Sequence, residues 1–292
     1  MKKRLLLVSI LAASQASADR LNIDLQFDEE GKARPEFSIP YSWNESLFSS
    51  LSYTSSSTTN TGGSELSENS ATTIQKDLIK LGLLGYKNTQ GAFEYSGSVN
   101  FEYLTLNKSQ FGYGELSSGL FVVENNVEIT SQTPSIDADV TYKSDKFSFR
   151  TGASVSIGAS LDVDQETEFR YLQTARTKHK STGEQNTSYS VHFESLFSLI
   201  PQFGIAINAE YRVLPLDYTV SALNAGGASY SEVEQSQEDS TLRYSLLFVF
   251  GQSLSGMSPS IGITHEEITS DDGSDSETIK ADYVTLGFDQ RF

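Results

Sequence analysis

The fold of this chain is decided by the stretch Ala92-Phe-Glu-Tyr-Ser-Gly-Ser-Val-Asn-Phe-Glu-Tyr-Leu-Thr105, in which apolar and polar side chains alternate. The odd positions hold Phe93, Tyr95, Val99, Phe101 and Tyr103, and the even positions hold Glu94, Ser96, Ser98, Asn100 and Glu102. Successive residues of a β-strand point to opposite faces of a sheet. The stretch therefore predicts a strand with one apolar and one polar face.

The same alternation recurs within 147–163, 187–198, 203–214 and 239–251. In the first of these it places Leu161 on the apolar face and Asp162 on the polar face. A soluble β-sandwich also alternates in this way. A membrane barrel is favoured because the segments run for about ten residues or more, against about five or six in globular sheets. Polar faces rich in Ser, Gly, Asn and Glu, and aromatic residues at the segment ends, point the same way.

Connections between these segments alternate in length. The short links are 44–46, 88–91, 143–146, 199–202 and 251–258, and the long polar links are 55–71, 164–186, 214–238 and 269–278. Transmembrane barrels have short turns at one end and long loops at the other. The pattern therefore predicts an all-β, single antiparallel barrel with long loops at one end.

Counting strands back from the end gives twelve: 279–292, 258–269, 239–251, 203–214, 187–198, 147–163, 133–142, 92–106, 72–87, 46–54, 36–43 and 21–27. An even number suits a single-chain barrel. The segment Glu115–Thr133 has mixed parity, so it is either a loop or an extra hairpin, which would give fourteen strands. Merging the first strands would give ten.

The N-terminal residues have the pattern of a secretory signal peptide. Lys2, Lys3 and Arg4 precede a short apolar stretch, and a small-residue cleavage pattern ends at Ala18. We expect residues 1–18 to be removed and 19–292 to form the barrel domain. The chain has no cysteine and a net charge of −17, which becomes −20 without the three basic residues of 1–18. This charge argues against a nucleic-acid partner.

The final strand contains Thr285 and Gly287 and ends at Phe292. Its apolar face includes Val284 and Leu286. This ending resembles the C-terminal assembly signal of outer-membrane β-barrel proteins of Gram-negative bacteria, with the porin-like members as the nearest type. Gln290 departs from the pattern, in which this position is usually apolar or aromatic. The resemblance implies a location in the cell outer membrane, contact with outer-membrane lipid, and insertion by the barrel-assembly machinery.

The inward faces carry many charged residues. The candidates for lining the lumen are Glu94, Glu102, Asp137, Asp139, Arg150, His192, Glu194, Glu210, Arg212, Arg243 and Glu266. One interpretation is a network of ion pairs that stiffens the wall. The other is a water-filled passive channel for small hydrophilic solutes, with a mild preference for cations because acids predominate. We expect no catalytic residues, metal or cofactor, and the oligomeric state stays open.

Two alternatives differ from a channel. A closed barrel would act as a surface receptor or adhesin through its acidic outer loops. A barrel hydrolase would need His192 as a base, but Ser190 lies beside it on the same strand with a parallel side chain, so a partner from another strand would be required. The acidic stretch 271–277 lacks the spacing of a calcium loop and is read as a solvated loop.

Overall fold

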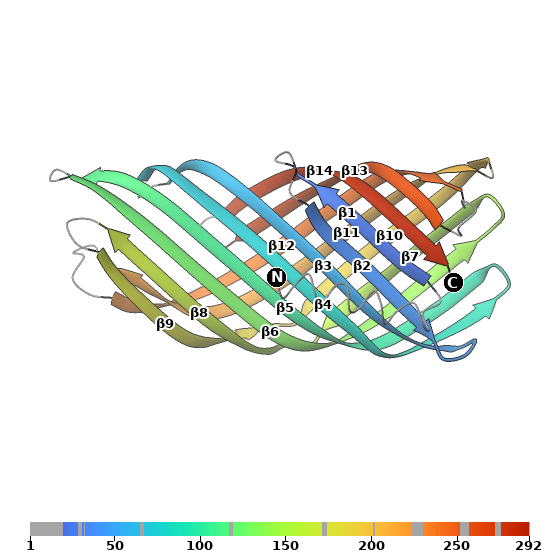
Figure 1. Cartoon of the computed structure of the whole chain (residues 1–292). Coiled ribbons are helices and arrows are strands. Elements are labelled where there is room, and N and C mark those ends of the chain that lie inside the picture. Colours follow the sequence, from blue (N-terminus) through green and yellow to red (C-terminus); the bar gives the residue numbers. More distant parts are fainter. Residues whose placement is uncertain are drawn as a thin grey trace.

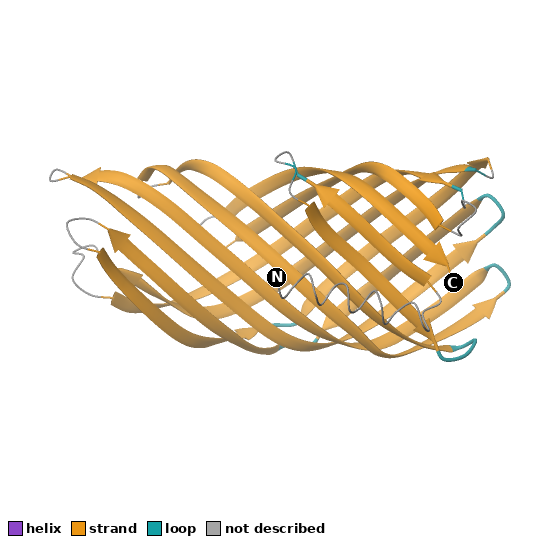
Figure 2. Cartoon of the chain, in the orientation of Figure 1, coloured by secondary structure: helices purple, strands orange, loops and turns teal. Residues whose placement is uncertain are grey.

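The described part of the chain consists almost entirely of β-strands. The structure is a computed structural model that describes residues 20–28, 31, 33–64, 67–116, 119–170, 174–200, 202–223, 230–251, 257–271 and 276–291. The expected signal peptide and Phe292 lie outside these residues. None of the described residues forms a helix that is long and apolar enough to cross a membrane. Figure 2 shows the strands and the short turns that join them at one end.

The strands form one closed antiparallel barrel. They are β1 (Arg20–Phe27), β2 (Ala33–Ser42), β3 (Leu47–Ser64), β4 (Ser67–Gln90), β5 (Phe93–Leu116), β6 (Gly119–Lys143), β7 (Phe147–Ser156), β8 (Ala159–Arg170), β9 (Thr174–Gln185), β10 (Ser188–Ile200), β11 (Phe203–Leu223), β12 (Tyr230–Phe250), β13 (Met257–Asp271) and β14 (Ser276–Arg291). β7 and β8 are successive parts of one wall strand, because both pair with β6. β9 and β10 are likewise parts of one wall strand, because both pair with β11. The described elements therefore make 12 wall strands, as the alternation predicts.

The barrel closes where β1 pairs with β14, for example at Leu25 opposite Leu286. Gly287 lies in this seam. A Cβ at this position would stand 2.2 Å from Ser260 Oγ and 2.4 Å from Asp24 Oδ1, so the close approach of two side chains requires glycine here. Gly287 thus has a packing role in the wall, separate from the assembly signal proposed from its position.

The outward faces form a belt of exposed apolar side chains. Its members include Tyr95, Val99, Phe101, Tyr103, Tyr189, Val191, Phe193, Leu242, Tyr244, Leu246, Phe248, Phe250, Ile261, Ile263, Val284 and Phe288. For these residues the outward orientation that alternation predicts is confirmed. On β5 the belt runs from Phe93 to Tyr103, about ten residues, which at the tilt of a barrel strand covers an apolar band about 25 Å tall. A belt of this height matches the hydrocarbon layer of a membrane.

Beyond the belt the wall continues as paired strands where the sequence analysis expected loops. Thr58 pairs with Ile74, Thr72 with Gln110, and Leu216 with Gln237. The predicted long loops 55–71, 164–186 and 214–238 are therefore wrong for most of their length. Their Ser and Thr content suited a loop, but Thr also favours strands, and backbone pairing with equally long neighbours holds these segments extended. In Figure 1 β5, β6, β8 and β9 run far past the ends of β1 and β2.

The uncertain segment Glu115–Thr133 also belongs to the wall. Its described residues are the end of β5 and the first part of β6, which pair from Glu115 with Leu120 to Asn107 with Glu128. Its described residues form neither a loop nor an extra hairpin, and the counts of ten and fourteen wall strands are wrong.

In the wall strand made of β7 and β8, the alternation reverses at residues 157–158. From Ser156 to Leu161 there are five steps along the chain, while their partners on β6, Ser135 and Ser131, are four steps apart. The extra residue is a β-bulge, and one extra residue exchanges the two faces. Leu161 is therefore fully buried inside and Asp162 is exposed outside, the reverse of the expectation.

The neighbouring strand has the same irregularity at the same level. Asn186 N donates to Pro215 O at 3.2 Å, and Ile157 N donates to Pro134 O at 2.9 Å. Both acceptors are prolines, which have no N–H to give back to a ladder. The two prolines thus leave the regular pairing incomplete where the two bulged strands cross them.

An apolar cluster fills the interior on the far side of the bulges. It contains Ile74, Leu104, Leu106, Val127, Ile129, Leu161, Val163, Leu214, Leu216, Tyr218, Val220 and Ile279, with Leu78 packed against it. We call this set the apolar plug. Leu161, Leu214 and Leu216 have no exposed surface, although they come from β8 and β11. The half of the barrel beyond the bulges is therefore closed by side chains from several strands.

The outer surface of β8 and β9 carries a ladder of ion pairs. Glu168 lies 2.7 Å from Arg176 and also pairs with Arg170, Lys178 lies 3.3 Å from Glu166, and Lys180 lies 2.7 Å from Asp164. Hydrogen bonding to Arg170 and Arg176 holds the pKa of Glu168 below its usual value, and hydrogen bonding to Asp164 raises the pKa of Lys180. Such a charged exterior belongs in water, which places β8 and β9 outside the membrane.

The reversal predicts opposite effects for two adjacent residues. Leu161→Ala should destabilise the barrel by about 3 kcal/mol, since it removes a fully buried side chain, whereas Asp162→Ala should change stability by about 0.5 kcal/mol or less. Urea unfolding followed by the fluorescence of Trp43 measures both. Equal losses in the two variants would contradict the reversed faces.

The ladder predicts a pH dependence at the tip. Because the pKa of Glu168 is lowered in the folded state, its contribution to stability is present above the unfolded pKa of about 4.3 and is lost as the pH falls through the folded pKa. Amide hydrogen exchange in β8 and β9, corrected for intrinsic rates, should be faster at pH 3 than at pH 6. Glu168→Gln should reduce that difference, and an unchanged difference would contradict the role of this carboxylate.

Candidate functional site

Charged side chains from opposite walls meet inside the barrel near its middle. Glu102 on β5 lies 2.9 Å from Arg212 on β11 and 3.2 Å from Lys80 on β4. Lys80 also lies 2.6 Å from Asp137, and Ser156 Oγ donates to Glu102 at 3.1 Å. Side chains of non-adjacent strands can meet only in the interior of a closed barrel. These residues form a network of ion pairs and hydrogen bonds in the barrel interior, which we call the central network.

A second bridge joins β12 to β2. Arg243 pairs with Glu36, which also accepts a hydrogen bond from Gln26 Nε2 at 3.2 Å. Nearby, Tyr283 donates to Glu266 at 3.1 Å. Arg34 lies with its guanidinium carbon 4.3 Å from the centre of the Tyr283 ring and donates to its hydroxyl. This bridge ties the short strands at the seam to the tall wall opposite.

A third group lies toward the end with the short turns. Arg150 is 3.2 Å from Asp139 and 3.7 Å from Glu194, and His192 Nε2 is 2.8 Å from Asp139 Oδ1. The last two atoms are close but are not aligned as a hydrogen bond. Glu94, at the rim, lies 3.3 Å from Lys143.

The geometry around His192 does not assemble a serine hydrolase. Among the described residues, the imidazole has no hydrogen bond to a serine hydroxyl, and Thr151 is bonded only to its backbone oxygen. The described residues also contain no cluster of three or more His, Asp or Glu side chains placed to hold a metal ion. The arrangement around Asp139 is an ion-pair group.

Gly152 gives His192 access to Asp139. A Cβ on Gly152 would stand 2.2 Å from Asp139 Oδ1 and 2.8 Å from His192 Cε1. The two side chains come from β10 and β6, and β7 lies between them. Their contact therefore passes over a strand position that must lack a side chain.

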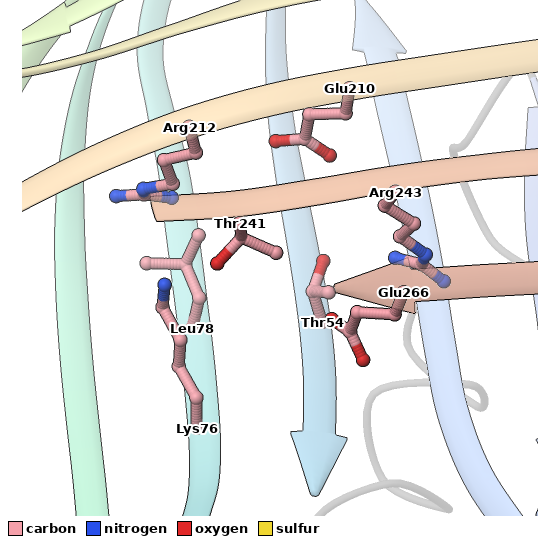
Figure 3. A pocket seen from close by; sticks show the side chains of 8 residues that line it. All are labelled: Thr54, Lys76, Leu78, Glu210, Arg212, Thr241, Arg243 and Glu266. Carbon is pink, nitrogen blue, oxygen red and sulfur yellow. The ribbon is translucent and has the colours of Figure 1, made fainter. Parts of the chain in front are cut away.

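The central network leaves a small pocket below the apolar plug. Thr54, Lys76, Leu78, Glu210, Arg212, Thr241, Arg243 and Glu266 line it, and it has a volume of about 60 Å³. In Figure 3 the ends of Lys76 and Arg212 lie on one side, the carboxylates of Glu210 and Glu266 lie toward the other, and two threonine hydroxyls lie between. We call this the central pocket.

A larger cavity of about 200 Å³ adjoins it toward the short-turn end. It shares Glu210 and Arg243 with the central pocket, and its lining includes Asp24, Glu36 and Glu194. Four carboxylates thus face one guanidinium and His192 in this lower cavity. The polar half of the lumen has an acidic lining, and it ends at the central pocket.

All eleven residues proposed to line the lumen lie in the described part of the barrel. The central network contains Glu102, Asp137 and Arg212, and the second bridge contains Arg243 and Glu266. The third group contains Asp139, Arg150, His192 and Glu194. Glu210 lines both cavities, and Glu94 lies at the rim. The expectation of an open, water-filled passive channel does not fit this arrangement. The physical reason is that Leu104, Leu106 and Leu214 follow the same inward parity as the charged residues and pack together as the plug.

Sequence reasoning missed Arg34, Tyr283, Asp24 and the two threonines of the central pocket. Parity carries the signal for Tyr283, because it lies two residues before the inward Thr285, whose hydroxyl is 2.7 Å from that of Thr264. Arg34 lay just outside the strand predicted from 36. Lys76, inward by parity, becomes informative only when the pocket around it is known.

The closed barrel, the apolar belt and the charged exterior beyond it define a transmembrane β-barrel with a polar lower lumen and a plugged upper lumen. No protein-family model and no curated protein sequence matches this chain. Among solved structures, the Pseudomonas putida toluene transporter TodX has 8% sequence identity, with 94% of this chain and 89% of that chain covered and a TM-score of 0.49.

Two further structures align over similar lengths. A Pseudomonas aeruginosa FadL homologue has 8% identity, 94% and 90% coverage and a TM-score of 0.47. The translocator domain of the autotransporter NalP from Neisseria meningitidis has 10% identity, 94% and 86% coverage and a TM-score of 0.43. What these proteins carry is a property of those proteins, and the interpretation of this chain rests on its own residues.

The contact over Gly152 predicts a sensitive position. Gly152→Ala should destabilise the barrel by about 1–3 kcal/mol, because the new methyl group overlaps Asp139 and the backbone oxygen of Ala138 at 2.6 Å. Gly97→Ala is the matched control, since its Cβ would meet only Asp137 O at 3.4 Å. Urea unfolding of both variants tests this, and an equally small effect at the two positions would contradict the close packing.

Proposed function

We propose that this chain is an outer-membrane barrel of a Gram-negative bacterium that is exported with a cleaved signal peptide and moves small polar solutes through its lumen in a gated manner. The observation that carries the proposal is the pair of adjoining polar cavities, the lower cavity and the central pocket, followed by the apolar plug. A purely structural barrel has no need of two polar cavities in series.

The gate in this proposal is the plug together with the central network. Polar solutes are excluded from a dry, close-packed cluster, because they would lose hydration without regaining hydrogen bonds. Passage therefore requires the plug to separate. The acidic lining below it favours cations over anions, as rings of charged side chains do in channels.

Opening the plug should raise conductance. We expect purified wild-type protein in planar bilayers to show rare or small current steps, and Leu104→Ser combined with Leu214→Ser to show larger and more frequent steps with cation preference. Both leucines are buried in the plug. Asp162→Ala, on the outside at the same end, is the control and should behave as wild type.

Heat-modifiable migration on gels shows whether each variant is a folded barrel. A folded double variant that never conducts would contradict a transport role. A wild-type barrel that is steadily open with large steps would contradict the gate.

A second candidate is a surface role for the outer extension. It is favoured by the ion-pair ladder of β8 and β9, which orders a charged surface beyond the membrane. In that case the receptor or adhesin surface is a paired sheet, where the sequence analysis expected acidic loops. Replacing the residues between Asp164 and Lys180 by a short turn should then abolish cell-surface binding of a partner and leave conductance unchanged.

A further inference from the structure

The central pocket contains one ammonium and one carboxylate that the wall does not neutralise. Within the described residues, Arg212 is paired with Glu102, and Arg243 with Glu36. No ion pair or side-chain hydrogen bond joins Lys76 or Glu210 to another described residue. Lys76 is partly buried, and Glu210 is exposed to the lumen.

The strand register explains why Glu210 has no ion-pair partner among the described residues. Glu210, Arg243 and Glu266 stand directly opposite one another on β11, β12 and β13. Arg243 therefore has a carboxylate on each side, but its guanidinium reaches across the lumen to Glu36. Glu266 accepts a hydrogen bond from Tyr283 instead. Of the two carboxylates that flank Arg243, Glu210 is therefore the one that has neither an ion pair nor a side-chain hydrogen bond to a described residue.

Lys76 is an ammonium that lacks a paired carboxylate among the described residues. It stands beside Leu106, a member of the plug, and opposite Ser56. An ammonium at the edge of an apolar cluster loses hydration and is stabilised by an anion that can reach it. Arg212, the nearest basic group in Figure 3, adds positive potential on the same side of the pocket.

We propose that the central pocket binds a small zwitterion, in the class of free amino acids, with its carboxylate at Lys76 and its ammonium at Glu210 and Glu266. A ligand with both charges pairs with the Lys76 ammonium and the Glu210 carboxylate at once, whereas a simple anion or cation leaves one of these two groups unpaired. The hydroxyls of Thr54 and Thr241 supply further hydrogen-bonding groups, and Leu78 offers an apolar wall for a short side chain. The volume of about 60 Å³ selects a small solute.

The route to this site runs through the lower cavity, because Glu210 and Arg243 line both spaces. The inference deepens the proposed function, since it names the class of solute that reaches the gate. It is tested by binding alone, so its outcome is independent of whether the plug opens.

Isothermal titration calorimetry of the full folded barrel in detergent, with L-alanine, acetate and methylammonium as probes, tests the inference. We expect L-alanine to bind more tightly than either single-charge probe. Lys76→Met should weaken L-alanine binding about tenfold or more, and Glu210→Gln should do likewise, because each removes one charge-assisted contact. Lys180→Met, the same substitution on the outer ladder, is the matched control and should leave binding unchanged.

The probes also separate the two halves of the site. Acetate binding should fall in Lys76→Met and not in Glu210→Gln, and methylammonium should show the reverse. Equal affinity for acetate and L-alanine, with no effect of Glu210→Gln, would overturn the zwitterion in favour of an anion site.

L-alanine binding that survives Lys76→Met in a barrel shown to be folded by heat-modifiable migration would overturn the proposal, as would no binding to the folded wild type. A barrel that binds L-alanine as expected and never conducts when its plug is removed would support this inference and reject the transport role.

Discussion

The whole structure depends on closure of the backbone hydrogen-bond ladder in a solvent that offers no substitute partners. In hydrocarbon an unpaired N–H or C=O costs several kcal/mol, so a sheet that crosses a membrane must have no free edge. Here the condition is met where β1 pairs with β14 over eight residues. Once the ring is closed, every inward side chain shares one interior with residues that are distant in the sequence.

That shared interior explains the ion pairs. Burying Glu102 and Arg212 costs hydration that their attraction only partly restores, so the net stability gained from the pair is small, while removing one partner alone would leave a buried charge unpaired. Each bridge spans the lumen and fixes the distance between walls that do not otherwise touch. The central network and the plug therefore act together, the first by holding the walls in register and the second by excluding water.

Much of the wall was predictable from the sequence, and most of the interior was not. The alternation around Phe101 and Glu102 depends only on neighbouring residues, so the strand type, the outward face and the number of wall strands followed from it. The exchange of faces at Leu161 and Asp162 comes from the bulge at 157–158, where Ile157 N bonds to Pro134 O on another strand, and the local alternation does not reveal it. Arg212 and Glu102 are 110 residues apart, and only the closed ring shows that they meet. Outer segments rich in Ser and Thr looked like loops because composition does not reveal whether a backbone has a partner.

The continuity of β11 has a mechanical consequence. This strand runs without a bulge from Phe203, at the short-turn end, to Leu223 at the opposite end, and it carries both Arg212 of the central network and Leu214 of the plug. A paired strand resists stretching along its axis, so a displacement of its far end would move Arg212 and Leu214 together. The extension beyond the membrane is thus mechanically coupled to both the central network and the plug.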